Sequence, residues 1–296
     1  MSPSFLENSM IVGAHPDDEL LWFTAIAGKV DQVVIVYRDY WAQPGIGERR
    51  ARAIARLPLN NVTCLDIAEA GTYGCADWSD PVLTDYGMEL GKEETRREFA
   101  RQVKRSVGKV VPFAPVASPE RIDRQYRANF ERIRAALRPR LSPGMNVFTH
   151  NPWGEYGHED HIQVFRVLES LREEIGFRLW MSNYCTERTL PLATRYFQKS
   201  PVPYVRLPAD RALAERIAGI YREEGCWTWA DDWSWFAEEC YLEAPRAEAG
   251  GAHHHLFPFN LFSIEPPKRQ GFRIPVKAAS ALLLSAVAGA ALVESL

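Results

Sequence analysis

Several features are scarce in this 296-residue sequence, and each scarcity excludes a class of protein. The five cysteines form no CxxC pair, so we expect neither a disulfide framework nor a zinc knuckle, and a reducing cytoplasm suits this usage. The 35 basic residues are balanced by 38 acidic ones, and the net charge of −3 gives no reason to expect nucleic acid as a partner. The opening residues, MSPSFLENS, have neither the basic region nor the apolar core of a signal peptide, which also favours a cytoplasmic protein.

Residues 278–293 form an unbroken run of small and apolar residues. The run is shorter than the roughly 20 residues that a helix needs to cross a bilayer. We therefore expect a helix that docks on the protein's own body or on a partner subunit, with a homo-oligomer and membrane association left open.

The first part of the chain alternates between apolar strands and helical patterns. Strands are predicted at 10–15, 33–37 and 62–67, with helices between them at 19–30 and 48–57. Asp17 or Asp18 is available to cap the first helix. This alternation predicts a parallel sheet with right-handed crossovers. We expect an α/β fold with a Rossmann-like, doubly wound and mostly parallel sheet and helices on both of its faces.

The whole chain, residues 1–296, is interpreted as a single domain. Its core is expected at about 8–190, with an insertion at about 69–117 that includes a basic stretch and a helix from Lys92, and an aromatic elaboration at about 200–296. Beyond the insertion, the pattern predicts a helix from Pro119, a strand at 146–151, a helix at 160–171, a strand ending at Tyr184 and a helix up to Glu224.

Two polar clusters follow predicted strands. The stretch IVGAHPDDELLW, residues 11–22, places a histidine and three carboxylates directly after the first strand, and NPWGEYGHEDH, residues 151–161, follows the strand NVFTHN. Loops at the carboxyl ends of parallel strands share one crevice, so we expect both clusters to line a single cleft. His150, just before the second cluster, is interpreted as capping the strand end and not as a metal ligand.

Three side chains from these clusters form a ligand set that suits zinc: His15, Asp18 and His161. Two imidazoles and one carboxylate are typical of a catalytic zinc site that keeps a position open for water. Zinc held in this way lowers the pKa of water toward ~7 and polarises a carbonyl oxygen. The alternative is a solvated acidic turn with an incidental HxxH pattern, which is disfavoured because both clusters follow apolar strands. We expect one Zn²⁺ per chain, with another divalent metal as the alternative.

Three further ionisable groups lie beside the ligand set. Hydrolysis of an amide requires a group that accepts a proton from water and a group that donates one to the leaving nitrogen. Asp17 suits the first role and His158 the second. Asp160 suits a carboxylate that orients a histidine through its second ring nitrogen.

The two clusters resemble the motifs of a known enzyme family. AHPDDE, residues 14–19, is similar to the signature of the LmbE-like or PIG-L deacetylases, and GEYGHEDH resembles their second motif, usually a glycine-rich turn followed by HPDH. The resemblance covers residues 10–184 and implies a zinc-dependent enzyme that removes N-acetyl groups from N-acetylglucosamine derivatives. It implies the same roles as above: ligands His15, Asp18 and His161, general base Asp17, and general acid or oxyanion stabiliser His158.

The sequence departs from the family pattern at two places. Glu159 stands where the family usually has proline, a change that we expect to leave the flanking ligand geometry intact. The family's early helix often carries an arginine with a glutamate three residues later, whereas this chain reads GERRARAIARL with no clean match. Arg49, Arg50 or Arg52 could touch a substrate, but the commoner explanation, solvated arginines on a helix face, is favoured.

Residues Cys226–Cys240, CWTWADDWSWFAEEC, form an aromatic segment that contains four of the nine tryptophans. Tryptophan faces in this segment could stack on the apolar side of a sugar ring, or they could simply cover the core, since each buries a large apolar surface. Both interpretations stay open for the individual residues.

Together these patterns predict a hydrolase that removes the acetyl group from an N-acetylated amino sugar or its conjugate, a small-molecule substrate. One alternative is a hydrolase with the same metal centre that acts on another amide, such as a thiol conjugate or an acylated natural product. Another is a catalytically degenerate module that binds a sugar or nucleotide. Asp17 argues against a simple binder, because binding alone has no use for a general base.

Overall fold

The computed structural model describes residues 4–40, 43, 45–91, 119–197, 204–244 and 260–263. The chain divides into two compact units, Met1–Phe262 and Ser263–Leu296, and the elements below all belong to the first. The predicted basic stretch and helix within 92–118 and the apolar run at 278–293 lie outside the described residues. Within the described ranges, no helix combines the length and the apolar character that crossing a membrane requires.

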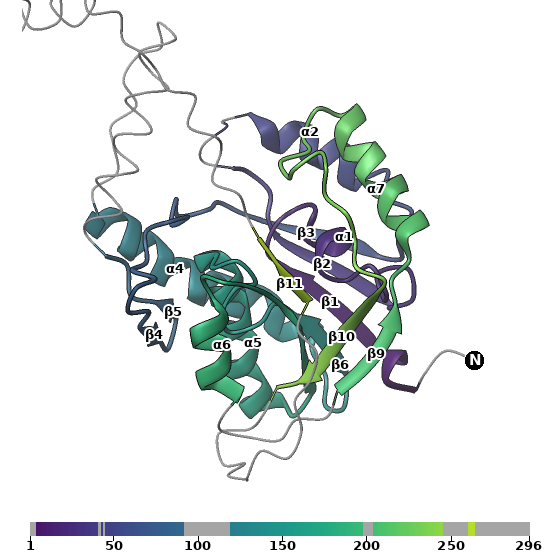
Figure 1. Cartoon of the computed structure of the whole chain (residues 1–296). Helices are drawn as coiled ribbons and strands as arrows, with labels where there is room; N and C mark the ends of the chain where they lie inside the picture. Colours follow the sequence, from purple (N-terminus) through teal and green to yellow (C-terminus); the bar gives the residue numbers. More distant parts are fainter. Residues whose placement is uncertain are drawn as a thin grey trace, which may run out of the picture. The chain divides into compact units, whose positions relative to one another are not determined.

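A seven-stranded sheet forms the centre of the first unit, with the strand order β3-β2-β1-β6-β7-β10-β9 (Figure 1). Its strands are β1 (Ser9–Gly13), β2 (Gln32–Tyr37), β3 (Val62–Ile67), β6 (Asn146–Thr149), β7 (Arg178–Ser182), β9 (Tyr204–Pro208) and β10 (Glu238–Glu243). The first five run parallel, and β10 pairs antiparallel with both β7 and β9. This confirms the prediction of an α/β fold with a mostly parallel sheet.

Two small sheets accompany the central one. They pair β4 (Leu83–Thr84) with β5 (Gly87–Met88), and β8 (Tyr184–Thr186) with β11 (Asn260–Phe262). The helices are α1 (Asp18–Leu21), α2 (Ile46–Ile54), α4 (Pro119–Leu137), α5 (Glu159–Ile175), α6 (Leu190–Phe197) and α7 (Arg211–Glu223), with 3₁₀ turns at Ser4–Leu6 and Arg138–Arg140.

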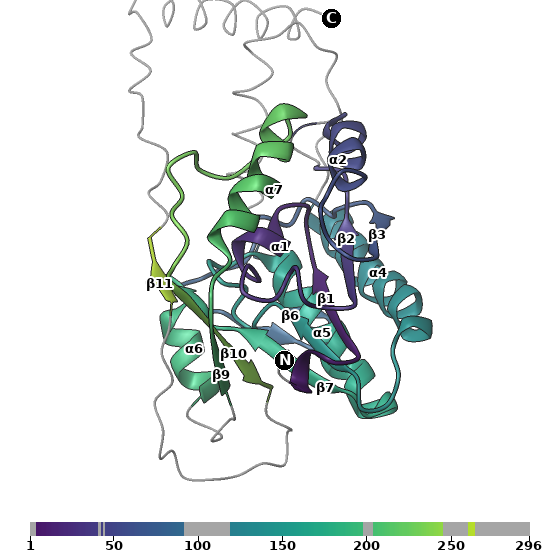
Figure 2. The same cartoon turned by 90° about the vertical axis from the view of Figure 1, so that its right-hand side faces the viewer.

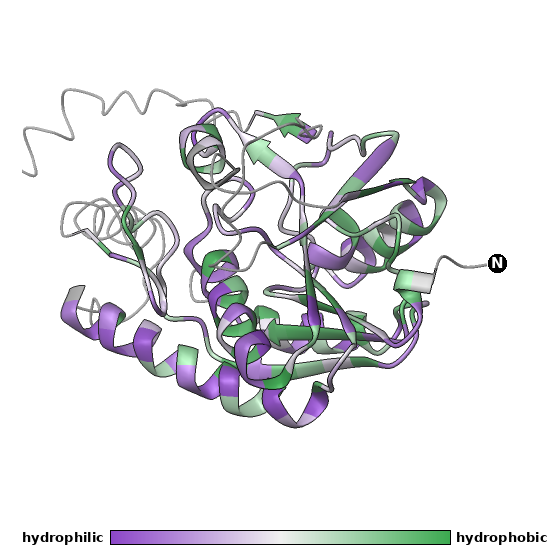
Figure 3. Ribbon diagram, turned by 90° about the horizontal axis from the view of Figure 1, so that it is seen from below, coloured by the Kyte–Doolittle hydropathy of each residue, from purple (hydrophilic) through white to green (hydrophobic). Residues whose placement is uncertain are grey.

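Alternate side chains along the strands enter two separate hydrophobic clusters. Ile11 of β1 joins a cluster with residues of α1 and α7, whereas Met10 and Val12 join one with residues of α4 and α5. Successive side chains of a strand point to opposite faces, so helices cover both faces of the sheet (Figure 2). In Figure 3 the strands of the sheet are mostly green and the helices alternate between purple and green, as expected for amphipathic helices on a buried sheet.

The predicted helix at 19–30 is wrong in length, because α1 ends at Leu21. The backbone N–H groups of Thr24 and Ala25 donate to the carboxylate of Glu239 on β10, at 3.2 and 2.9 Å, and not to helical carbonyls. The apolar residues that follow α1 are nearly all fully buried, so their spacing carried no information about a helix face. The turns at 23–30 therefore follow from a contact with a distant strand.

The carboxyl ends of β1 and β6 lie side by side. The two strands are paired in parallel, and Val12 of β1 stands opposite Thr149 of β6. The loop of residues 14–18 and the loop of residues 150–158 therefore leave the same edge of the sheet as neighbours. This pairing brings the two polar clusters of the sequence together.

Candidate metal centre

The loop of residues 14–18, the first loop, places two aspartates in a tight turn between β1 and α1. Asp17 has a φ of 106°, a left-handed conformation that a non-glycine residue adopts at some energetic cost. It stands at the N-cap position of α1, but its side chain makes no cap hydrogen bond. Asp18, the first helical residue, accepts a hydrogen bond from the backbone N–H of His15 at 2.6 Å. The turn therefore directs the Asp18 carboxylate back to the backbone of His15, whereas the Asp17 carboxylate makes no hydrogen bond to the start of α1.

Asp18 is buried and held at both carboxylate oxygens. Its Oδ1 accepts the indole N–H of Trp22 at 2.8 Å, one helical turn further along the chain. Burial alone would disfavour its charge, but His161 and His150 hold the pKa of Asp18 well below its ordinary value. The Asp18 carboxylate is therefore ionised at neutral pH, as a metal ligand must be.

The loop of residues 150–158, the second loop, is organised around the carboxylate of Glu155. This carboxylate is fully buried and accepts from the hydroxyl of Ser182 at 2.5 Å. Its Oε2 lies 2.7 Å from Nδ1 of His161 and 3.1 Å from Nδ1 of His150. Despite the burial, the neighbouring His150 and His161 lower the pKa of Glu155 to about 2, so the carboxylate is ionised. An ionised carboxylate only accepts, so each of these Nδ1 atoms carries a proton.

The tautomer of His161 leaves its Nε2 lone pair free to bind a metal, because the proton is on Nδ1. Burial lowers the pKa of His161, which favours the neutral ring. Burial opposes a charged ring at His150, but the Glu155 and Asp18 carboxylates raise the pKa of His150 to about 10. Its Nε2 lies 3.2 Å from Oδ2 of Asp18 and 2.9 Å from the backbone nitrogen of Ala14, a contact between the end of β6 and the end of β1. This contact agrees with the expectation that His150 caps a strand end.

Two carboxylates face the other imidazole of the ligand set, that of His15. Its Nε2 lies 3.4 Å from Asp160 Oδ2 and 3.6 Å from Glu69 Oε1. Burial opposes a charged ring, but the Asp160 and Glu69 carboxylates raise the pKa of His15. Since both carboxylates accept, Nε2 carries a proton and Nδ1 is directed to the other side, toward His161. Asp160 is thus placed to orient His15.

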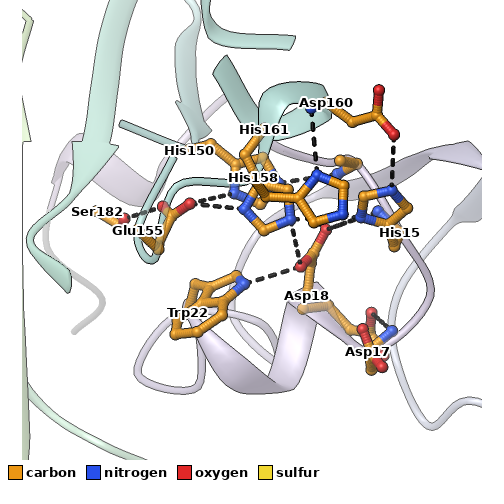
Figure 4. Close-up of polar contacts among 12 residues, drawn as sticks. His15, Asp17, Asp18, Trp22, His150, Glu155, His158, Asp160, His161 and Ser182 are labelled. Carbon is orange, nitrogen blue, oxygen red and sulfur yellow. Dashed lines mark hydrogen bonds and ion pairs between the residues drawn. The ribbon is translucent and has the colours of Figure 1, made fainter. Parts of the chain in front are cut away.

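The side chains of His15, Asp18 and His161 lie together, with their polar atoms facing one another (Figure 4). His15 Nδ1 and His161 Nε2 are 3.3 Å apart, with Asp18 Oδ2 3.7 Å from the first and Asp18 Oδ1 3.4 Å from the second. Two lone pairs and a carboxylate so close together require a positive charge between them, either a shared proton or a cation. Bonds of about 2.0–2.1 Å to zinc in a tetrahedron place ligand atoms about 3.3–3.4 Å apart, so the residues fit this metal.

Two other groups of side chains in the cluster could also hold a metal ion, His15–His158–His161 and Asp18–His150–His161. In each of them two imidazoles are nearly parallel: the rings of His158 and His161 are 8° apart, and those of His150 and His161 are 23° apart. Parallel rings that face each other do not direct their in-plane lone pairs to a common point. The rings of His15 and His161 are inclined at 41° and can do so.

A third group, His15–Glu69–Asp160, lies on the opposite side of the His15 ring. Its two carboxylates face the protonated Nε2 of His15, and Arg50 already places a positive charge 3.9 Å from Glu69. The Glu69 and Asp160 carboxylates therefore hold the ring of His15 in its orientation.

Asp17 and His158 lie beside the ligand set with properties that differ from those of the ligands. Burial and the neighbouring Asp18 raise the pKa of Asp17 to about 7. His158 accepts from the backbone N–H of Asp160 at Nδ1, so its proton is on Nε2. Burial, aided by His15, holds the pKa of His158 well below its ordinary value. Its neutral ring therefore offers a hydrogen-bond donor.

The structure thus places all six residues that the sequence singled out in one buried cluster: His15, Asp17, Asp18, His158, Asp160 and His161. Sequence reasoning missed the residues that support them, namely Glu69, Trp22, Glu155 and Thr228. The sequence could have indicated Glu155, because it lies within the second cluster and a carboxylate close to a metal-binding histidine is common.

The expectation for the early arginines is wrong at one position. Arg50 is only 3% exposed, and its guanidinium donates to the carbonyl of Arg38 and contacts Thr228. Arg52 is exposed, as expected. The helix pattern could not distinguish them, because Arg50 faces a segment from the far end of the chain.

Glu159, the departure from the family motif, does not contact the ligand atoms. Its buried carboxylate accepts the backbone N–H groups of Gly74 and Ala76 at 3.2 and 2.9 Å. Burial raises the pKa of Glu159 to about 7. The residue therefore anchors the loop at 71–76, where proline could not.

A scan of the sequence against protein-family models gives no match, and a search of curated protein sequences gives none either. The resemblance to the LmbE-like or PIG-L deacetylases therefore rests on the two motifs.

Proposed function

We propose that this protein is a zinc-dependent amide hydrolase that removes the acetyl group from an N-acetylated amino sugar or its conjugate. One observation carries the proposal: Nδ1 of His15 lies 3.3 Å from Nε2 of His161, and the two carboxylate oxygens of Asp18 lie 3.7 Å from the first and 3.4 Å from the second. Buried carboxylates set the tautomers of both histidines so that these nitrogens are the ligand atoms. The same three residues were selected from the sequence by ligand type and spacing.

Zinc bound there supplies a Lewis acid that polarises the acetyl carbonyl and lowers the pKa of water. Asp17 is the proton acceptor, because its carboxylate interacts electrostatically with the ligands Asp18 and His15 and belongs to none of the three candidate ligand groups of the described residues. A pKa near that of the reacting solution suits a general base. Asp17 takes one proton from the attacking water as the new carbon–oxygen bond forms.

His158 acts as a hydrogen-bond donor through Nε2. Because its ring is neutral, it stabilises the carbonyl oxygen as negative charge develops there, without transferring its proton. The proton held by Asp17 then passes to the nitrogen as the carbon–nitrogen bond breaks. The acetic acid that forms gives its remaining proton to the amine, so the products are acetate and the protonated amine.

The sheet topology supports the finer description of the fold as Rossmann-like and doubly wound. In the order β3-β2-β1-β6-β7, the chain runs outward from β1 to β3 and then continues from β6 on the other side of β1. In such sheets ligands bind beyond the carboxyl ends of the strands where the order reverses. The six site residues follow β1 and β6, the two strands that flank this point.

The test is an acetate-release screen of the zinc-loaded protein on free, nucleotide-linked and lipid-linked N-acetylhexosamines. We expect release from at least one class, none after chelation of the metal, and little from the Asp17→Asn variant. Release of a different acid from a thiol conjugate or another acylated amine would assign the same centre to another amide. Sugar binding that is equal in wild type and Asp17→Asn, with no release, would show a binding module and refute the proposal.

A further inference from the structure

The aromatic segment, residues Cys226–Cys240, contacts the first loop of the site. The hydroxyl of Thr228 donates to Oδ2 of Asp17 at 2.8 Å, across 211 residues of sequence. The next residue, Trp229, meets the ring of Trp22 edge to face, with centroids 5.5 Å apart. Trp22 in turn holds Asp18. One segment therefore contacts Asp17 directly and Asp18 through Trp22.

Arg50 determines the direction of the hydrogen bond between Thr228 and Asp17. Its buried guanidinium donates from Nη2 toward the hydroxyl oxygen of Thr228, at 3.4 Å. A hydroxyl that accepts from an arginine offers its own proton to the other neighbour, here the carboxylate of Asp17. The chain of donors therefore runs from Arg50 through Thr228 to Asp17.

The contact occupies one of the two oxygens of Asp17. Within the described part of the chain, Oδ2 accepts from Thr228, and no hydrogen bond to Oδ1 is found. The backbone of Asp17 is held separately: its N–H donates to Glu19, and its carbonyl accepts from residues of α1. The hydrogen bond from Thr228 is thus the contact that orients the side chain on this backbone.

We propose that Thr228, directed by Arg50, is the positioning residue for Asp17 and leaves Oδ1 as the oxygen that accepts the proton. The inference rests on the proposed function, since it assigns a role within that reaction. It gives the aromatic segment a part in the chemistry beyond covering the core. Positioning of this kind acts on the rate of reaction more than on substrate binding, because the orientation of a base matters most in the transition state.

Three variants test the proposal by steady-state kinetics of acetate release. Thr228→Val keeps the shape and removes the hydroxyl, so kcat should fall about three- to tenfold while KM and the bound zinc stay nearly unchanged. Thr228→Ser restores the hydroxyl and should recover most of kcat. Thr194→Val, which removes an exposed hydroxyl that bonds only its own helix, is the matched control and should leave kcat unchanged.

A thermal unfolding cycle provides a readout that does not depend on turnover. Thr228→Val should lower the melting temperature of the zinc-free protein when Asp17 is present, and lower it less in an Asp17→Ala background. Equal shifts in both backgrounds would show that the hydroxyl does not interact with Asp17 and would overturn the inference.

The kinetic outcomes separate the two proposals. Wild-type protein that releases no acyl group from any substrate would refute the proposed function, and the inference with it. An active wild type with full kcat in Thr228→Val, or a serine variant as slow as the valine variant, would refute only the role of Thr228.

Discussion

The two loops that build the site hold their side chains in different ways. Glu155 of the second loop, residues 150–158, orients the ring of His161 in the first turn of α5, only six residues away. In the first loop, residues 14–18, the carboxylate of Asp17 is oriented by Thr228, which lies 211 residues away. The histidine side of the site is therefore largely organised by its own sequence, and the Asp17 side by the rest of the fold.

This difference has a physical basis. The partner of a metal-binding imidazole sets its tautomer, and a carboxylate nearby in the sequence does this at small entropic cost. A carboxylate that serves as a base needs one free oxygen and a defined orientation, which a partner from another element can provide. Substitutions that disturb the contact between Glu155 and His161 should therefore affect the metal first, and those around Asp17 should affect turnover first.

The largest effect is expected for the histidine side. His161→Ala removes a ligand nitrogen, so the protein should lose its stoichiometric metal and all acyl release. His158→Ala, the matched control, should keep the metal because its Nδ1 is occupied by the backbone N–H of Asp160. Elemental analysis after dialysis measures both. Metal retained in the first variant, or lost in the second, would reverse the ligand assignment.

The second-largest effect is expected for Asp17 of the first loop. Asp17→Asn keeps the shape of the side chain but cannot accept a proton, so turnover should fall by about 10² to 10⁴ with the metal still bound. Single-turnover rates and metal content measured on the same preparation separate the two quantities. If this variant loses its metal, Asp17 is itself a ligand and the contrast between the loops fails.

A smaller effect is expected for the carboxylate that orients His161. Glu155→Gln should weaken zinc binding about 10- to 100-fold, because the imidazole loses a charged acceptor at Nδ1. Competition with a chromophoric chelator measures the affinity. Glu173→Gln, an exposed acid on α5, serves as the control and should leave the affinity unchanged. An unaltered affinity in Glu155→Gln would mean that the second loop does not set the tautomer.

The smallest effect is expected for the indole that holds Asp18. Trp22→Phe keeps an aromatic ring and removes the N–H that donates to Oδ1 of Asp18, so zinc affinity should fall about fivefold, or ~1 kcal/mol. Trp227→Phe is matched to it, because the indole N–H of Trp227 has no hydrogen-bond partner in the described part of the chain. The same chelator assay compares them, and equal affinities would show that Asp18 does not depend on this bond.

Much of the site could be predicted from the sequence. Apolar runs end just before both clusters, and ligand types at these positions selected His15, Asp18 and His161 with three neighbours. The prediction of proximity depended on one general property: carboxyl ends of adjacent parallel strands meet at one edge. The pairing of β1 with β6 satisfies that condition.

Local sequence therefore encodes the strand pattern, the two clusters and the chemical types that they contain. Tertiary structure decided where α1 ends, through Glu239 of β10, and which arginine is buried, through the contact of Arg50 with Thr228. It also decided which oxygen of Asp17 stays open. Local patterns report the periodicity and chemistry of neighbouring residues, whereas these three features depend on contacts between segments about 180 to 215 residues apart. No local pattern records such contacts, because they form only when the sheet brings its distant segments together.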